Sequence, residues 1–584
     1  GATAGGGATA GGGATAGGGA TAGGGATAGG GATAGGGATA GGGATAGGGA
    51  SFVVSPPSWD AGEQAVGDSV GQVFMVTNTG GVPLAGVNSS FVSSPAFSHN
   101  DSCAGQTLGV GGSCTITVRF NAPAAQAYAS QATASTTTAG PPAVTVPVSG
   151  RGYDISTITL NVVNGPDAGV VSSADGGLSN CSTGPCIYTV RRGTPLTLVA
   201  NPNRFWGLAS WTGGSCSGDD NCAFNATAAT HTVNARFERY NRAFVTGQTF
   251  NGQFGSVGAA DSRCSDVAAD AGLSPPGARW IALLSTTTGG GQSAVTRLGA
   301  AGGFVRTDGL PLADDADHLA IGPFLYPPVL DERARTIGGA NLDIWVGDID
   351  GTTALNCSNW QADTATGTFG NFSGTPNLFG SVGSVTCNSL KHLACFESMT
   401  NMPALRVAPI PGGGRRAFLS TAKLAANTIL TSADATCRSE AIAAGLPNAN
   451  TFQALYSTPT QTGAARFNTL AGTWYRVDGV QLFTAAADLA LPTRAQLAHL
   501  NVHANGTFER SNFLTGASAT SGATEAAWTG GDPASTASMT SSCNNWSATS
   551  GTGSRGVPGV LGSTFISSVT SSCAQPNWVY CLEN

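Results

Sequence analysis

The fourteen cysteines of this chain lie in small local groups, and this pattern limits how the chain can fold. Each group holds an even number of cysteines, which indicates disulfides formed outside the cytoplasm. Zinc binding is the alternative, but the sequence contains no C-x-x-C pair and few histidines. The groups are Cys103 and Cys114; Cys181, Cys186, Cys216 and Cys222; Cys264, Cys357, Cys387 and Cys395; and Cys437, Cys543, Cys573 and Cys581. We therefore expect several disulfide-bonded domains in a protein that is secreted or displayed at a cell surface.

The charge of the chain argues against several classes of partner. Only 10% of the 584 residues are charged, the net charge is −7, and lysine occurs only at Lys391 and Lys423. Nucleic acids and anionic membranes require clustered lysine and arginine, so we expect neither as a partner. No run of 18 apolar residues is present, so we expect no membrane insertion. Because no constellation of acid, base and nucleophile and no Gly-rich phosphate loop emerges, we expect no enzyme activity and no cofactor.

Residues 1–50 repeat the hexad Gly-Ala-Thr-Ala-Gly-Gly without a substitution. The segment is uncharged and has no side chain larger than threonine, so one copy cannot bury enough apolar surface to offset the entropy of ordering. Alone it would be a flexible linker with a span of about 40 Å. Many copies could instead stack as flat sheets or polyglycine helices, because every face is small. Two hypotheses stay open: self-association through residues 1–50, or a flexible tether.

Residues 51–152 have the pattern of a β-sandwich. In "CTITVRF", Ile116, Val118 and Phe120 alternate with polar residues, and "AVTVPVSG" repeats the alternation between turn-forming residues. The order of "VFMVTNTGG", "SCAGQTLGVGGSCTITVRF" and "VTVPVSGRG" resembles the hydin-like, choice-of-anchor group of immunoglobulin-like domains. This resemblance implies a spacer or adhesive module with a disulfide between Cys103 and Cys114.

Residues 153–240 predict a second β-rich module. "STITLNVVNG" alternates, and a Gly-Thr-x-x-x-Leu strand is followed by the turn Trp211–Gly213 and the closing strand Val233–Phe237. These features resemble a divergent internalin-type B-repeat, a β-grasp-like module common on bacterial surfaces. We expect Trp211 to lie in its core rather than to form a ligand platform. Inside this module we would pair Cys181–Cys186 and Cys216–Cys222.

The rest of the chain contains an internal duplication. The segments that match are "AADSRCSDVAADAGL" with "SADATCRSEAIAAGL", "WIALLST" with "FQALYST", "GGFVRTDGLPL" with "GTWYRVDGVQL", "IWVGDIDG" with "AWTGGDPA", and "CNSLKHLACFES" with "CAQPNWVYCLEN". We therefore expect two copies of one domain, a first copy at 241–400 and a second copy at 417–584, joined by a linker at 401–416. Each copy opens with a helix that ends at a capping glycine, Gly272 or Gly445.

Both copies carry a further set of family motifs. Each has a Cys-x-x-Trp, "CSNW" at 357–360 and "CNNW" at 543–546, and the chain ends in "CLEN" after a pair of cysteines seven residues apart. This combination resembles the endostatin family, the C-terminal domain of some collagens, and implies an α+β, C-type-lectin-like fold with nested disulfides. The implied pairs are Cys264–Cys395, Cys357–Cys387, Cys437–Cys581 and Cys543–Cys573. The family's ligands do not transfer, because its arginine-rich heparin-binding face and zinc-binding histidines have no counterpart.

Two pairs of residues are candidate metal ligands. Asp348 and Asp350, in "DIDG", could hold Ca²⁺, but calcium requires about six to eight oxygen ligands and the second copy has "GGDP" at this place. The same sequence favours a solvated turn. His499 and His503 have the spacing of two zinc ligands on one helix face, yet "HLNVHANG" favours a loop and provides no third ligand.

Two further motifs resemble catalytic or lectin sites. Residues 67–71 fit the Gly-x-Ser-x-Gly elbow of hydrolases, but a strand follows them where the elbow needs a helix. The tripeptide at 575–577 resembles the sugar-selecting Gln-Pro-Asn of calcium-dependent lectins, although those lectins place it before their last cysteine pair. Trp578 lacks an aromatic equivalent in the first copy and could be exposed. The recurring tryptophans are expected in the core: Trp280, Trp345, Trp360, Trp474, Trp528 and Trp546.

The sequence as a whole predicts a multidomain, β-rich chain. It combines the hexad repeat, an immunoglobulin-like β-sandwich, a small β-grasp-like domain and two α+β C-type-lectin-like domains. We expect a non-enzymatic extracellular structural protein of bacterial type, whose repeat self-assembles into a fibre or matrix decorated by disulfide-bonded binding domains. The alternative is a surface adhesin, in which the repeat is a tether and the tandem endostatin-like domains bind an extracellular glycan, a matrix protein or a host surface.

Overall fold

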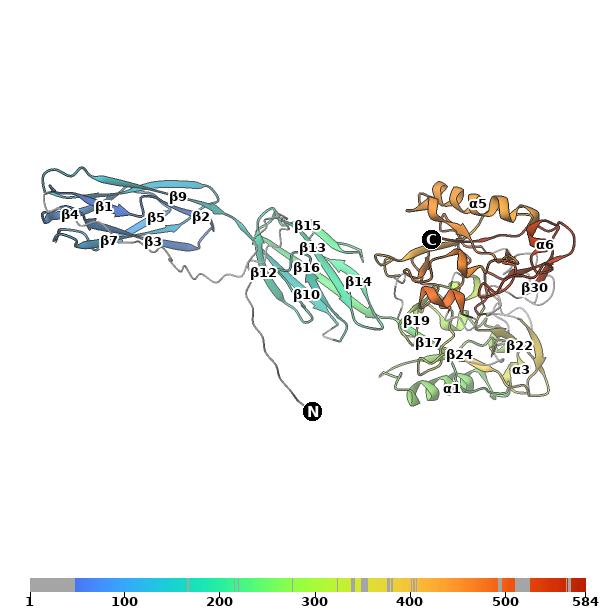
Figure 1. The fold of residues 1–584 in the computed structure, drawn as a ribbon. Coiled ribbons are helices and arrows are strands. Elements are labelled where there is room, and N and C mark those ends of the chain that lie inside the picture. Colours follow the sequence, from blue (N-terminus) through green and yellow to red (C-terminus); the bar gives the residue numbers. More distant parts are fainter. Residues whose placement is uncertain are drawn as a thin grey trace, which may run out of the picture. The chain divides into compact units, whose positions relative to one another are not determined.

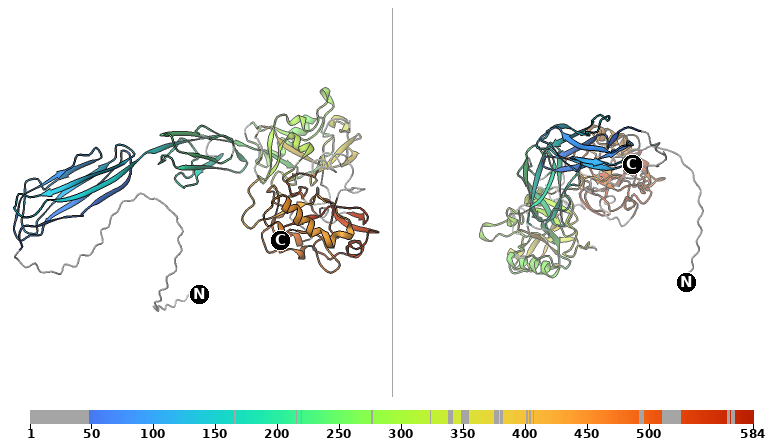
Figure 2. Two further views of the ribbon diagram at one scale, coloured as in Figure 1. Left: turned by 90° about the horizontal axis from the view of Figure 1, so that it is seen from above. Right: turned by 90° about the vertical axis from the view of Figure 1, so that its left-hand side faces the viewer.

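The computed structural model divides the chain into two compact units, Gly1–Arg151 and Gly152–Asn584 (Figure 1 and Figure 2). It describes residues 48–164, 167–214, 216–218, 220–275, 277–322, 324–337, 342–347, 355–374, 379, 382–400, 402, 405, 407–491, 496–509, 526–562, 565 and 569–584. The predicted assembly segment at 1–50 therefore lies outside the described residues, apart from its last three. The described chain is β-rich and multidomain, as the sequence predicted.

The first unit is built from two sheets with a core between them. Alternation in β7 buries Ile116, Val118 and Phe120, which pack with further aromatic residues of the same core. Gly150 of β9 faces the Phe120 ring so closely that an added Cβ would lie 2.8 Å from it, so only glycine fits there. One sheet has the strand order β1 (Phe52–Ser55), β3 (Ser69–Asn78), β7 (Ser113–Asn121), β5 (Phe97–Asp101). The other sheet has the strand order β2 (Trp59–Ala65), β9 (Val144–Tyr153), β8 (Ala127–Ser135), β4 (Leu84–Phe91), β6 (Gln106–Leu108).

The second unit begins with two further sheets, formed by residues 155–239. Strands β10 and β16 pair in parallel, and their alternating apolar residues meet the other sheet. Trp211 is 1% exposed and its indole N–H donates to the Asp220 carbonyl at 2.6 Å, so it lies in the core as predicted. One sheet has the strand order β12 (Cys186–Arg191), β10 (Ile155–Val163), β16 (Thr230–Arg239), β14 (Trp206–Thr212). The other sheet has the strand order β11 (Gly169–Ser173), β13 (Pro195–Pro202), β15 (Cys222–Asn225).

The first copy is built around β17, which lies between the parallel strand β19 and the antiparallel strand β24. Helix α1 begins after Ser256, whose hydroxyl accepts from the Ala259 N–H, and it ends just before Gly272, where φ is 72°. The predicted helix and its capping glycine are thus confirmed. The elements are β17 (Asn241–Val245), α1 (Val257–Asp270), β18 (Trp280–Ala282), β19 (Gly302–Arg306), β20 (Pro311–Asp315), α2 (Ala316–Ile321), β21 (Asp343–Trp345), α3 (Cys357–Trp360), β22 (Thr366–Asn371), β23 (Gly383–Thr386) and β24 (His392–Glu397).

The second copy repeats most of this arrangement, although its described residues form no strand equivalent to β20. Strand β25 lies between the parallel strand β27 and the antiparallel strand β31, and β26 pairs with β31 as β18 pairs with β24. Helix α5 also ends before a glycine with positive φ, Gly445. The elements are β25 (Arg415–Leu419), α5 (Ile429–Ala443), β26 (Gln453–Ala454), β27 (Trp474–Arg476), β28 (Ala527–Trp528), α6 (Cys543–Trp546), β29 (Thr552–Gly556), β30 (Val569–Ser572) and β31 (Tyr580–Leu582).

Equivalent tryptophans make equivalent hydrogen bonds in the two copies. The Trp360 indole N–H donates to the Ser285 carbonyl at 2.8 Å, and that of Trp546 donates to the Ser457 carbonyl at 2.9 Å. All six recurring tryptophans are at most 2% exposed, which confirms that they belong to the core. Short 3-10 turns complete the described elements: Thr288–Gly290, Thr296–Leu298, Ala426–Thr428, Ala449–Thr451, Ala464–Arg466 and Ala486–Ala490.

The one-turn elements α3 and α6 are left-handed. All four residues of each turn have positive φ, between 54° and 66° in Cys357–Trp360 and between 49° and 57° in Cys543–Trp546. Such a conformation costs about 1–2 kcal/mol for each residue that is not glycine, and asparagine tolerates it best. Each turn places a disulfide cysteine and a core tryptophan three residues apart, so both are fixed in the core by one short element.

One predicted boundary is wrong by two residues. The linker was expected to run to residue 416, but β25 starts at Arg415 and pairs with β27 from its first residue. The turn at 412–414 ends at Gly414, so the strand begins directly after it. The disulfides of the structure join the same cysteines as the expected pairs: Cys103–Cys114, Cys181–Cys186, Cys216–Cys222, Cys264–Cys395, Cys357–Cys387, Cys437–Cys581 and Cys543–Cys573.

Candidate functional site

The two copies pack against each other through equivalent segments. Gly374 and Val560 precede Cys387 and Cys573 by the same number of residues, and these two equivalent residues form a backbone bridge between the copies. Next to the bridge, the Leu561 N–H donates to the Ser373 carbonyl at 3.3 Å. A contact in which a segment meets its own equivalent is the signature of approximate twofold symmetry. The duplication has therefore produced an internal pseudo-dimer.

Tyr326 of the first copy is inserted into this interface. Its side chain packs with the core of the second copy and is 5% exposed. The Gln481 backbone N–H donates to the Tyr326 hydroxyl at 2.8 Å, and the Arg476 guanidinium donates to the Phe324 carbonyl at 3.3 Å. Burial raises the pKa of Tyr326, so its hydroxyl keeps its proton and remains a donor at neutral pH.

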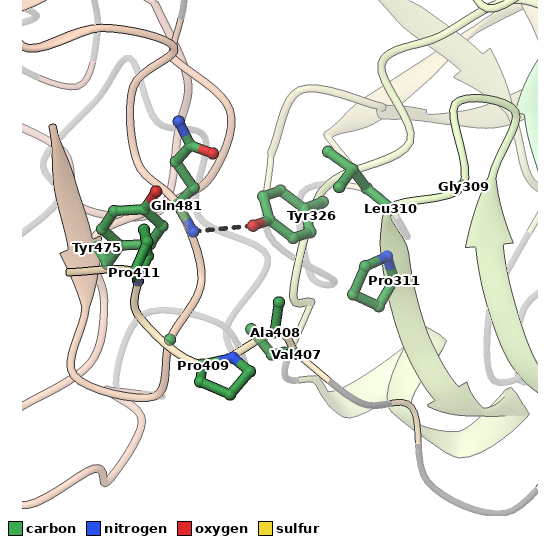
Figure 3. Close-up of a pocket in the computed structure, with 11 residues that line it drawn as sticks. Gly309, Leu310, Pro311, Tyr326, Val407, Ala408, Pro409, Pro411, Tyr475 and Gln481 are labelled. Atoms are coloured by element: carbon green, nitrogen blue, oxygen red, sulfur yellow. Dashed lines mark hydrogen bonds between the residues drawn. The ribbon is translucent and has the colours of Figure 1, made fainter. Parts of the chain in front are cut away.

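A cavity of about 450 Å³ lies beside Tyr326, between the copies (Figure 3). This volume falls in the range of about 300–1,000 Å³ that ligand pockets usually have. Two equivalent hairpin turns, 309–311 and 479–481, contribute to its walls, and the linker segment 407–411 contributes another. We call this cavity the cleft. Because both copies and the linker form it, a single copy would not contain it. Its lining residues are Gly309, Leu310, Pro311, Tyr326, Val407, Ala408, Pro409, Pro411, Tyr475, Gly479 and Gln481.

The side chains that line the cleft are uncharged. None of the residues that line it is acidic, basic, histidine, serine or cysteine, so tyrosine is the one residue type in this described lining that acts in acid–base or nucleophilic chemistry. The nearest buried arginines are neutralised within their own hairpins, Arg306 by Asp308 and Arg476 by Asp478. The polar groups are the hydroxyls of Tyr326 and Tyr475 and the amide of Gln481, whose Nε2 donates to the Phe483 carbonyl at 2.8 Å.

The structure describes one of the two predicted pairs of metal ligands, His499 and His503. Asp348 and Asp350 lie outside the described residues. The His499 Nε2–H donates to the Ser373 carbonyl, 3.0 Å away, whereas the His503 Nδ1–H donates to the Leu419 carbonyl and its Nε2 lies 3.1 Å from Glu509 Oε2. The two imidazoles are therefore held by different partners. Among the residues that the structure describes, no cluster of His, Cys, Asp or Glu has the geometry to hold a metal ion.

The catalytic and lectin motifs are structural. Gly67 lies in the turn between β2 and β3, and Ser69 is the first residue of β3, so residues 67–71 form part of a hairpin rather than an elbow that leads into a helix. In the tripeptide at 575–577, Asn577 is 1% exposed and exchanges two backbone hydrogen bonds with Leu424. Its side chain is therefore directed into the protein and is not available to a sugar.

The expectation that Trp578 could be exposed is wrong. Its side chain is 3% exposed, and the Lys423 ammonium lies 4.4 Å from the ring centroid. The equivalent position of the first copy holds His392, which is also buried. This position is therefore a buried ring in both copies, an indole in the second and an imidazole in the first. The absence of Trp, Tyr or Phe from the first copy did not indicate that the position is exposed.

Sequence reasoning missed the residues that form the cleft. Tyr475 follows Trp474 in β27, and the alternation of that strand, buried on either side of Tyr475, could have shown that its side chain points outward. Tyr326 gave no signal, because alanine (Ala498) occupies the equivalent place in the second copy. The positions of these residues depend on how the copies pack, which local sequence patterns do not contain.

In the described part of the chain, no helix is long and apolar enough to cross a membrane.

The comparisons with known proteins match parts of this chain. Three similar solved structures each match 17–18% of this chain. One is a protein of unknown function from Porphyromonas gingivalis W83, with 17% identity, a TM-score of 0.15 and 49% of that chain covered. The others are the ASH/PapD-like domain 7 of human CEP192, with 11% identity, a TM-score of 0.16 and 85% of that chain covered, and the VesB protease of Vibrio cholerae, with 22% identity, a TM-score of 0.15 and 31% of that chain covered. This chain thus spans about half the length of the first of them. A search of curated proteins found no match. A family model, the HYDIN/CFA65/VesB-like, Ig-like domain, matches residues 50–151. Residues 50–151 are therefore an immunoglobulin-like domain of this type, as the sequence predicted.

Proposed function

We propose that this protein is a non-enzymatic extracellular adhesin that captures a polymer in the cleft between its two C-terminal copies. The observation that carries the proposal is the composite cleft, because it is formed jointly by both copies and their linker. A tandem duplication that only lengthened the molecule would need no such shared cavity. Seven disulfides support a location outside the cytoplasm, at a cell surface or in the medium.

The proposal includes the domain types that the motifs suggest. We propose that the two copies are endostatin-like domains of C-type-lectin-like fold and that residues 153–240 are a divergent internalin-type B-repeat. The nested disulfides of each copy and the parallel pairing of β10 with β16 support these assignments. The immunoglobulin-like domain and the B-repeat would then act as spacers between the hexad segment and the cleft.

An array of extracellular glycans and matrix proteins, probed with the full chain, tests the adhesin proposal. We expect binding to at least one polymer, and we expect Tyr475→Ala to weaken it at least about fivefold, because truncating a buried interfacial tyrosine can cost more than about 1 kcal/mol. Tyr153→Ala is the matched control, since it removes a half-buried tyrosine far from the cleft in sequence. Binding to no polymer, or binding that Tyr475→Ala leaves unchanged, would contradict the proposal.

Self-assembly of the hexad repeat is a second candidate function, and it does not conflict with the first. It is favoured by the exact repetition of the hexad and by the fit of its last residues. The Gly81 N–H donates to the Gly48 carbonyl at 3.2 Å, and a Cβ on Gly80 would lie 2.6 Å from the Gly49 carbonyl oxygen. Glycines of the repeat, Gly48 and Gly49, therefore pack directly against glycines of the β-sandwich, Gly80 and Gly81. Electron microscopy is expected to show filaments that disappear when residues 1–47 are deleted; monomers in both samples would exclude assembly.

A further inference from the structure

A proline-containing segment of the chain itself already packs at the cleft. Pro409 and Pro411 of the linker line the cavity beside Tyr475 (Figure 3). Ile410 Cγ2 and Tyr475 Cε2 lie 2.7 and 2.9 Å from the position that a Cβ on Gly414 would occupy, so the linker is held close to the tyrosine ring. The surface next to the cavity therefore accepts a prolyl chain without regular secondary structure. A ligand in the cleft would extend this existing interface.

The cleft selects against charge. Its lining consists of proline, glycine, aliphatic and tyrosine residues and one glutamine. A charged ligand group placed there would lose its hydration without gaining an ion pair from the lining, which is uncharged, and the buried Arg306 and Arg476 are already paired with Asp308 and Asp478. An uncharged ligand avoids this penalty.

The hydrogen-bonding side chains of the cleft are few, and the two tyrosine hydroxyls among them can donate. The Tyr326 hydroxyl accepts from Gln481, which leaves its own proton to donate, and the Tyr475 hydroxyl makes no hydrogen bond within the described residues. A sugar ring carries several hydroxyls, and most of them would stay unsatisfied in such a place. A peptide in the polyproline conformation has no internal hydrogen bonds and presents carbonyl oxygens, which need donors. Aromatic grooves recognise such segments because little conformational entropy is lost on binding.

We propose that the cleft binds an extended, uncharged, proline-containing peptide segment of an extracellular protein. This inference rests on the proposed function and names its ligand. The prolyl rings would pack against Tyr475 and the linker, and the carbonyls would accept hydrogen bonds from the tyrosine hydroxyls. The peptide would lie between the two hairpin turns, where both copies contact it.

Binding of labelled peptides to the full chain tests this proposal by fluorescence polarisation. The probes are a proline decapeptide, a Gly-Ser decapeptide of equal length and the neutral oligosaccharide cellohexaose. We expect only the proline peptide to bind, with an affinity that is unchanged between 0.05 and 0.5 M salt because no ion pairs form, against the steep loss that charge-driven binding shows above about 0.1 M. Tyr475→Phe removes one unpartnered hydroxyl and is expected to weaken binding about 3- to 10-fold.

Two further variants locate the ligand. Ala408→Trp places a large side chain at an exposed position that lines the cleft and is expected to abolish binding, whereas Tyr153→Ala is expected to leave it unchanged. Proline-peptide binding that survives Ala408→Trp, or the absence of such binding at millimolar peptide, overturns the inference. Cellohexaose binding that Ala408→Trp abolishes also overturns it but leaves the adhesin proposal intact. The adhesin proposal fails only if the array shows no polymer whose binding requires the cleft.

Discussion

The two copies share one scaffold but use their last glutamate differently. Glu397 and Glu583 both stand two residues after the last cysteine of their copy. Glu397 is fully buried and accepts hydrogen bonds from Arg242 and from Arg239, which belongs to the preceding module. Glu583 accepts from the Arg416 backbone N–H at 2.8 Å, while the Arg416 guanidinium lies 3.8 Å away. The same carboxylate therefore anchors a neighbouring domain in the first copy, whereas its described partners in the second belong to its own copy and include the Asn448 amide, which donates to it at 2.7 Å.

The copies also differ at the residue that opens each central strand. In the first copy, the Asn241 amide donates to the carbonyls of Gly302 and Thr400, both at 2.6 Å. In the second copy, the Arg415 Nε donates to the Gly472 carbonyl at 2.7 Å. Both Nη atoms are buried without a hydrogen-bond partner among the described residues, and the guanidinium lies 3.7 Å from the centroid of the Trp474 ring. Burial lowers the pKa of Arg415 to about 10, although the negative charge of Glu583 acts to raise it. Duplication thus preserved the inner scaffold and let the positions facing the rest of the chain diverge.

The long disulfides provide the largest test of the shared scaffold. Cys264–Cys395 spans 131 residues and Cys437–Cys581 spans 144. On the chain-entropy account, each stabilises its copy by about 5 kcal/mol, because the cost of closing a loop grows only with the logarithm of its length. We expect replacement of either pair by alanine to destabilise its own copy equally. Hydrogen exchange of α1 and α5, measured by mass spectrometry, reads the two copies separately. A loss that differs by more than about 2 kcal/mol would contradict the equivalence of the scaffolds.

Replacement of the terminal glutamates tests the main difference between the copies. We expect Glu397→Gln to destabilise the first copy by about 3–5 kcal/mol, because it leaves buried arginine charge without its partner. We expect Glu583→Gln to cost about 1–2 kcal/mol, since the hydrogen bonds that its charged group accepts from the Arg416 N–H and the Asn448 amide are weakened. Equilibrium denaturation followed by tryptophan fluorescence measures both. Equal losses would mean that the contact to Arg239 adds nothing.

Local patterns in the sequence were sufficient for the scaffold. Alternation predicted β7, because a strand that separates core from solvent must alternate, and glycine marked the ends of both helices, because the backbone takes positive φ there. Cysteine spacing indicated the nested bridges through the family resemblance. The end of the linker was missed because Gly412–Gly414 predicts a turn but not the residue at which pairing resumes.

The cleft could not be predicted, for a physical reason. Its walls are two hairpin turns that are far apart in sequence and are brought together only when the copies pack. The duplication even concealed it, since Tyr326 and Tyr475 occupy places that hold Ala498 and Val305 in the other copy. A site that breaks the symmetry of a repeat leaves no repeated motif. Only the geometry of the packed pair reveals it.

His499 makes the second copy sensitive to acid at a position where the first copy has no titratable side chain. Burial lowers the pKa of His499 to about 4, and the equivalent residue of the first copy is Pro327, which cannot titrate. The unfolded chain binds a proton below about pH 6.5, but the folded chain does not until about pH 4. Stability present above pH 6.5 is therefore lost as the pH falls, by up to about 3 kcal/mol. We expect His499→Gln to remove most of this loss in denaturation measured from pH 7 to pH 4.5.

His503 is the control for the acid effect, because its sign is opposite. Burial lowers the pKa of His503, but hydrogen bonds with Glu509 and the Leu419 carbonyl outweigh burial and raise it. Its contribution is therefore present below pH 6.5 and is lost as the pH rises through the higher folded value. We expect His503→Gln to destabilise the chain at pH 6 more than at pH 8. A common direction for the two variants would show that general acid expansion, and not these imidazoles, sets the pH dependence.

The left-handed turns give the smallest contrast between the copies. Asn359 and Asn545 have φ of 58° and 53°, so alanine at either place costs about 1 kcal/mol or slightly more. Asn359 Oδ1 also accepts from the Thr287 N–H at 2.7 Å and from the hydroxyls of Thr286 and Thr287, whereas the Asn545 side chain makes no hydrogen bond within the described residues. We therefore expect Asn359→Ala to cost about 2–3 kcal/mol and Asn545→Ala about 1 kcal/mol. Glycine separates the two effects, because it adopts positive φ without strain. Asn545→Gly is expected to be nearly neutral and Asn359→Gly to lose only the hydrogen bonds; equal losses for both glycine variants would show that the backbone, and not the asparagine oxygen, distinguishes the turns.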